Sequence, residues 1–152
     1  MIALTMMTLM FAAVFPMAVR GAQYSSNYAQ AATLAQHKLD QLRSAGFSRL
    51  FTPTGDNSLT SLNIIDAVNA PNSYDFTTAD SLVSSGTTQG YFPPGSAGTV
   101  TIVDYASTPT GAANGVPGNT LAYVTVTLVW TNTGVANSSY STSAVIAKAA
   151  QP

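Results

Sequence analysis

Few residues in this chain of 152 could carry out acid–base or nucleophilic chemistry. His37 is the single histidine, and it lies close to Lys38 and Asp40 in a stretch with a helical pattern. A general base has to be held within hydrogen-bond reach of the proton that it removes, and no nucleophile has a spacing that would place it there. We therefore predict a solvent-facing or interface position on a helix for His37, and we assign no catalytic residue.

Sequence motifs of enzymes and cofactor-binding proteins are also missing. The chain has no G-x-S-x-G or H-E-x-x-H motif, no phosphate-binding loop and no dinucleotide fingerprint. It has no cysteine, which excludes disulfides, thiolate metal sites and a cysteine nucleophile. Asp56, Asp66, Asp75 and Asp80 have spacings that match no calcium-binding loop. We therefore predict that the protein is not an enzyme and has no cofactor and no metal site.

The composition excludes two further classes of protein. The 5 Lys and Arg residues against 6 acidic ones give a net charge of -1, which excludes a basic nucleic-acid-binding protein. A hydrophobic content of 46% excludes a disordered chain, because such chains combine low hydrophobicity with high net charge. Charged residues make up 7% of the chain, so Ser and Thr have to supply most of its polar surface.

One sequon for N-glycosylation is present, Asn137-Ser138-Ser139. We keep Asn137 as a candidate glycosylation site. The alternative is that these residues form a polar β-turn.

The strongest pattern in the sequence is an apolar run at residues 1–19, which carries no charge. As an α-helix this run would be about 28 Å long, close to the thickness of about 30 Å of a bilayer's hydrocarbon core. A cleaved signal peptide is the alternative, but signal peptides carry positive charge ahead of the apolar region. Here the first positive charge, Arg20, follows it. We therefore predict that the run is the first half of one long helix.

The helical pattern continues beyond this run to Gly46, but it becomes one-sided. Gly46 suits a helix end, and Arg43 in the last turn suits the negative end of the helix dipole. We expect one stripe of this second half to pack against the rest of the protein. Its residues are Tyr24, Tyr28, Ala31, Ala35, Leu39 and Leu42.

Pro16 and Gly21 predict a break within the long helix. A proline inside a helix removes one backbone hydrogen bond and clashes with the preceding turn, at a cost of about 3 kcal/mol. Glycine adds local conformational freedom. We therefore expect the helix to kink or open near Pro16, above all in an assembled state; a transmembrane kink that is merely tolerated is the alternative.

The C-terminal third of the chain changes to a two-residue period. In LAYVTVTLVWTN, Val124, Val126, Leu128 and Trp130 share one face of a strand. GTVTIVDY, and YSTSAVIAKAA after a turn-like segment at 132–139, predict two more strands. Together they predict an antiparallel meander.

These patterns predict an α+β fold whose chain is organised in four parts. They are an apolar helix half (1–20), an amphipathic helix half that packs on the head (21–50), a loop-rich connection with at most a short helix or strand (51–98), and an antiparallel β-sheet head (99–152).

Several of these residues together resemble the type IV pilin and pseudopilin superfamily. They are the opening MIAL, the helix proline Pro16, the continuation AATLAQHKLDQLRSAGF and the terminal run YVTVTLVWTN with YSTSAVIA. The chain is most similar to the minor pilins and the general-secretion pseudopilins of that superfamily. The resemblance covers residues 1–50 well and the last strands loosely. It implies a long N-terminal helix, kinked or melted near Pro16, that packs on an antiparallel head.

The same resemblance implies the protein's location and partners. Such a subunit waits in the inner (cytoplasmic) membrane and is assembled into an extracellular filament by a membrane platform and a separate ATPase. Members of the family carry a Glu near the mature start, and counting back from Pro16 places it before Met1. Either the sequence begins inside the family's mature region, or Met1 is the first residue and Thr5 stands where the Glu is expected.

Physical chemistry supports such an assembly. A long apolar helix is stable in lipid or in a bundle of identical helices, because both keep its side chains out of water. Methionines fill irregular gaps between such helices. Repeating the contact between subunits by a rotation that does not close on itself produces a filament. We predict a homo-oligomeric, helical filament that serves motility, adhesion, DNA uptake or secretion. The alternatives are a pseudopilin of a secretion system and a membrane-tethered monomeric adhesion or binding domain whose β face, with Tyr123 and Trp130, contacts a ligand. The residues predicted to pack in the filament core are Met1, Ile2, Leu4, Met6, Met7, Leu9, Met10, Phe11, Val14, Phe15 and Met17.

Overall fold

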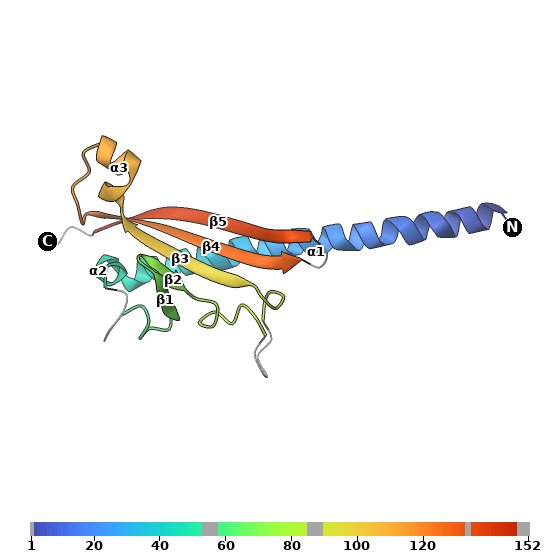
Figure 1. The fold of residues 1–152 in the computed structure, drawn as a ribbon, viewed down its shortest axis with the longest axis horizontal. Helices are drawn as coiled ribbons and strands as arrows, with labels where there is room; N and C mark the ends of the chain where they lie inside the picture. Colours follow the sequence, from blue (N-terminus) through green and yellow to red (C-terminus); the bar gives the residue numbers. More distant parts are fainter. Residues whose placement is uncertain (1, 53–57, 85–89, 133–134, 149–152) are drawn as a thin grey trace.

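The protein consists of one long helix and a five-stranded antiparallel sheet (Figure 1), so its fold is α+β. The computed structural model describes residues 2–52, 58–84, 90–132 and 135–148; for 2–11, 13, 67, 132, 135 and 136 it describes the backbone alone. Helix α1 (Ile2–Ala45) lies along the sheet with its second half and extends beyond the sheet with its first half (Figure 1).

The helix does not open near Pro16 in the single chain. Helix α1 is continuous over Ile2–Ala45, with Pro16 and Gly21 inside it. The proline removes only its own backbone hydrogen bond, and the neighbouring Ala, Phe and Met residues sustain the helix on both sides. The prediction of a melted segment is therefore wrong for the isolated chain, whereas a kink at Pro16 and an opening of the helix in an assembled state stay predictions.

Helix α1 ends at the position that the sequence predicts. Gly46 adopts a positive φ of 91°, which an L-residue with a side chain rarely tolerates. Its backbone N–H donates to the carbonyl of Arg43 at 3.3 Å. The chain then turns directly into the one-turn helix α2 (Phe47–Leu50).

The sheet is a meander in which every strand pairs with its neighbours in the chain. Its last three strands were predicted, whereas its first two lie in the segment predicted to be a loop-rich connection. Between β3 and β4 come the 3₁₀ turn η1 (Tyr105–Ser107) and the short helix α3 (Pro109–Ala113). The strands are β1 (Ala67–Ala70), β2 (Ser73–Asp75), β3 (Ala97–Asp104), β4 (Leu121–Asn132) and β5 (Val135–Ala147).

Strand β5 begins earlier than predicted, because residues 135–139 belong to it and not to a turn. Trp130 of β4 pairs with Ser138 of β5, and the register shifts between Trp130 and Asn132. The Asn and Ser residues at the start of β5 resemble a turn in sequence. They are compatible with a strand because β5 is the edge of the sheet and one of its faces is open to water.

The two faces of the sheet differ as the alternation in β4 predicts. Val124, Val126, Leu128 and Trp130 are buried on the face that meets α1. The opposite face carries hydroxyl groups that pair between strands: Thr125 with Ser143 at 3.0 Å and Thr127 with Ser141 at 3.1 Å. Uncharged hydroxyl groups therefore keep this face polar.

Candidate functional site

The second half of α1 packs on the sheet through the predicted stripe. Ala31, Ala35, Leu39 and Leu42 are at most 2% exposed and belong to one core cluster with the inner face of the sheet. These four positions are confirmed as the contact between helix and head.

The two tyrosines of the stripe lie where the helix leaves the head. Tyr24 is half-buried, and Tyr28 is 44% exposed. The ring of Tyr28 meets Trp130 edge-on, with ring centroids 4.9 Å apart. The core therefore ends near Tyr28.

Lys38 is the part of this contact that the sequence analysis missed. The residue is fully buried between helix and head. Its Nζ donates to the carbonyl of Ile64 at 2.9 Å and to Oδ1 of Asp80 at 2.8 Å. Nζ also lies 4.9 Å from the centre of the Phe76 ring. One ammonium group thus ties the helix to two segments of the head.

The pKa of Lys38 reflects this environment. Burial lowers the pKa of its ammonium group, while the hydrogen bond and charge of Asp80 and the charge of Asp66 act in the opposite direction. The residue follows Ala35 by three positions and precedes Leu42 by four, which places it beside the buried stripe. That spacing was the available signal, although the sequence does not reveal which group pairs with the lysine.

The first half of α1 offers a contrasting surface. Val14, Phe15 and Met17 are 63%, 69% and 77% exposed, and they are outside the core of the described chain. The remaining predicted filament-core residues, from Met1 to Phe11, lie outside the described side chains. Where side chains are described, no helix contains an apolar stretch long enough for a membrane crossing.

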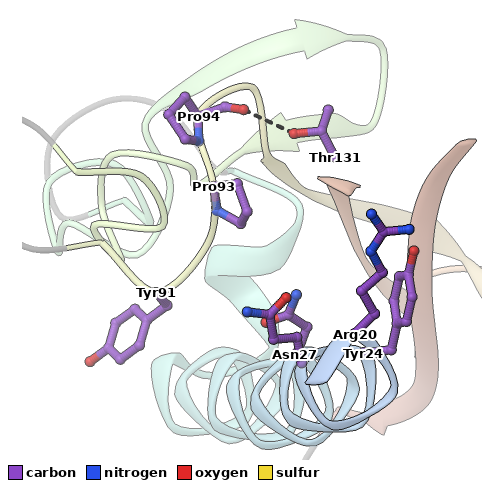
Figure 2. Close-up of a pocket in the computed structure, with 8 residues that line it drawn as sticks. Arg20, Tyr24, Asn27, Tyr91, Pro93, Pro94 and Thr131 are labelled. Carbon is purple, nitrogen blue, oxygen red and sulfur yellow. Dashed lines mark hydrogen bonds between the residues drawn. The ribbon is translucent and has the colours of Figure 1, made fainter. Parts of the chain in front are cut away.

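A cleft of about 820 Å³, which we call the neck cleft, lies where α1 leaves the head. Figure 2 shows Arg20 and Tyr24 next to each other on the helix, with Tyr91 on the far side of the cleft. Thr131 donates to the carbonyl of Pro94 at 3.0 Å, which fixes the wall formed by the loop (Figure 2). The residues that line the cleft are Arg20, Gln23, Tyr24, Asn27, Tyr91, Pro93, Pro94 and Thr131.

The chemistry of the neck cleft suits binding. Its lining combines a guanidinium group, two amides and two phenols, and it contains no carboxylate or imidazole. The guanidinium, amide and phenol groups offer hydrogen bonds and ring contacts to a partner.

The aspartates of the head have structural roles. Asp66 accepts from the backbone N–H groups of Thr78 and Ala79, both at 2.6 Å. Asp104 accepts from the N–H groups of Ala106 and Asn119 at 3.2 and 2.8 Å. Within the described residues, no three His, Cys, Asp or Glu side chains gather as a metal site would require.

The remaining residues singled out by sequence have different outcomes. His37 is exposed on α1, as predicted. Asn137 is exposed in strand β5, so the alternative of a β-turn is wrong. Trp130 is completely buried and therefore cannot contact a ligand at the surface. Tyr123 lies on the opposite face, with its ring centroid 6.2 Å from that of Tyr105.

The candidate site therefore has two neighbouring parts, the exposed apolar surface of α1 and the neck cleft. Comparisons with protein-family models, with curated proteins and with solved structures find no match.

Proposed function

We propose that this chain is a pilin-like structural subunit that polymerises through its N-terminal helix into an extracellular filament. The observation that carries the proposal is the exposure of Val14, Phe15 and Met17 on a helix that projects from the head (Figure 1). Burial of such side chains by copies of the chain stabilises an assembly by about 1.5–3 kcal/mol for each large residue.

The construction of the head supports the proposal. The second half of α1 is fixed to the sheet by Leu39, Leu42 and the buried pair of Lys38 with Asp80. A projecting helix can hold subunits together in a filament only when it is firmly joined to its own head. The resemblance to pilins adds the assembly platform and the external ATPase.

The distribution of polar groups also supports a filament. The outer sheet face carries hydroxyl pairs, such as Thr125 with Ser143, and the sequence has no charged residue over 105–147. Hydroxyl groups hydrate a surface without the repulsion that a high charge would create between closely packed heads.

Electron microscopy of the sheared cell-surface fraction tests the proposal. Cells that produce the wild-type chain are expected to carry long fibres that an antibody against the head labels. The double variant Phe15→Asp/Met17→Asp should abolish the fibres, because each carboxylate would be buried without a partner. Ser141→Asp, at an exposed position of the outer sheet face, is the matched control and should leave the fibres intact.

Two results would contradict the proposal. One is a wild-type chain found only as single molecules at the cell surface, which would favour the membrane-tethered monomeric domain. The other is fibre formation by the double aspartate variant at the wild-type level.

A further inference from the structure

Arg20 is a charged residue whose position calls for a partner. It is exposed on α1 at the neck cleft and makes no ion pair within the described part of the chain. The proposed function would bring copies of α1 together around this position. A charge that enters such an interface without a partner is strongly unfavourable. The filament therefore needs a carboxylate close to Arg20.

The head's described carboxylates are already in use. Asp80 holds the buried Lys38. Asp66, Asp75 and Asp104 accept hydrogen bonds from backbone N–H groups of the head. Satisfying Arg20 with one of these groups would disturb the head.

Asp40 is the one acidic residue of α1, and it is available. Its single described partner is Arg43, at 3.1 Å, with side chains that are 67% and 50% exposed. Exposed pairs of this kind contribute little to stability. The carboxylate can also accept hydrogen bonds from a second guanidinium group.

The positions of Arg20 and Asp40 around the helix suit a contact between subunits. Successive residues of an α-helix are turned by about 100°, so Arg20 lies about 55° from the middle of the buried stripe, whereas Asp40 lies about 145° from it. Arg20 therefore points to the head side of α1, and Asp40 points away from the head.

A filament that buries its apolar helices has them in the centre and the polar heads outside. The side of a projecting helix that faces its own head then points away from the filament axis. It meets the side of a neighbouring subunit's helix that points toward the axis. Arg20 lies on the side that points away from the axis, and Asp40 of the partner subunit lies on the side that points toward it. The open neck cleft leaves room for a carboxylate beside Arg20 (Figure 2).

The axial distance between the two residues fixes the offset of such neighbours. The separation of Arg20 and Asp40 corresponds to about 30 Å along a helix. This distance also prevents the two side chains from pairing within one chain.

We propose that Arg20 pairs with Asp40 of the partner subunit in the filament, and that this pair sets an offset of about 30 Å between parallel helices. The inference rests on the proposed function and specifies its interface. Each subunit uses Arg20 toward one neighbour and Asp40 toward another, so the contact is heterologous and continues along the fibre.

A charge exchange tests the pair. Arg20→Asp and Asp40→Arg should each reduce the number of fibres at least tenfold, because each brings like charges together. The double variant Arg20→Asp/Asp40→Arg should restore fibres toward the wild-type level. Arg43→Ala is the matched control: it removes the described partner of Asp40 on the same helix and should leave fibre formation unchanged.

Cysteine crosslinking gives a direct measure of proximity, because the chain contains no cysteine. A direct disulfide requires Cα atoms within about 7 Å, closer than a pair with a long arginine side chain requires, so a short bifunctional maleimide is the suitable reagent. Treatment of fibres built from Arg20→Cys/Asp40→Cys with this reagent should give a ladder of dimers, trimers and longer species. Arg20→Cys alone, and Arg20→Cys/Ser141→Cys with its second cysteine on the outer sheet face, should give no ladder.

The outcomes separate this inference from the proposed function. Fibres without a ladder in Arg20→Cys/Asp40→Cys, together with no rescue by the charge exchange, overturn the pair and leave the filament standing. Absence of fibres from the wild-type chain overturns the filament, and the pair with it.

Discussion

The two halves of α1 belong to one continuous helix, yet their surroundings are opposite. The second half buries Leu39 and Leu42 against the sheet and holds a buried ion pair through Lys38. The first half exposes Phe15 and Met17 to solvent. Apolar content alone therefore does not decide burial; the presence of a partner does. The second half has its partner within the chain, and on our proposal the first half finds it in other copies.

The largest effect on the stability of the head is expected from Lys38→Ala. The substitution leaves the Asp80 carboxylate buried without its partner, and breaking a buried pair in this way costs about 3–5 kcal/mol. Urea unfolding followed by circular dichroism measures the loss.

Lys38→Met/Asp80→Leu is the control for this prediction. Removing both charges leaves no unpaired charge, and only the neutral carbonyl of Ile64 loses a partner, so the double variant should recover most of the stability. A single variant as stable as the wild type, or a double variant less stable than Lys38→Ala, would contradict the assignment of the pair as the link between helix and head.

A pair of truncations compares the two halves directly. Leu42→Ala should cost about 2–5 kcal/mol in free energy of unfolding, because Leu42 is fully buried. Phe15→Ala should change it by less than about 0.5 kcal/mol, since Phe15 is 69% exposed. The number of fibres, in contrast, should fall in Phe15→Ala, because the proposed contact between subunits loses an apolar side chain. A large loss of head stability in Phe15→Ala would mean that the first half has a partner within its own chain.

These contrasts also show how far the sequence predicts the structure. The stripe from Ala31 to Leu42, the helix end at Gly46 and the two faces of β4 follow from local periodicity, and all of them are confirmed. Periodicity reports which side of an element is apolar. Periodicity was therefore sufficient to predict the buried positions wherever two apolar faces pack against each other.

The features that were missed depend on contacts between distant segments. Asp80, 42 residues away, provides the counter-charge for the buried Lys38. Nothing in the spacing of the two residues indicates that they pair. Strands β1 and β2 have only 4 and 3 residues; β2 is held by pairing with β3, and β1 by pairing with β2. The neck cleft likewise joins α1 to a loop around Tyr91 that has no recognisable motif.

The stability that Lys38 contributes to the head should depend on pH in the alkaline range. Burial lowers the pKa of its ammonium group in the folded chain below the value of about 10.4 in the unfolded chain. Between these two pKa values the unfolded chain binds more protons, so the free energy of unfolding contributed by Lys38 rises with pH, by at most about 1.4 kcal/mol per pH unit.

The wild type should therefore gain stability relative to Lys38→Met/Asp80→Leu as the pH rises toward 10. Burial raises the pKa of Tyr74, so its contribution has the opposite sign and is lost as the pH increases, but Tyr74 is present in both chains and cancels in the difference. Urea titrations at several pH values give the comparison. A difference that stays constant or changes sign would show that the lysine is not desolvated.

Pro16→Ala should have the smallest effect on unfolding of the head, because Pro16 lies in the exposed half of α1. Restoring the missing backbone hydrogen bond should slow amide exchange near Pro16 without moving the urea midpoint. If assembly opens the helix at this position, the same substitution should reduce fibre formation, because it stabilises the closed helix. Normal fibres from Pro16→Ala would mean that the continuous helix of the single chain is also the form that assembles.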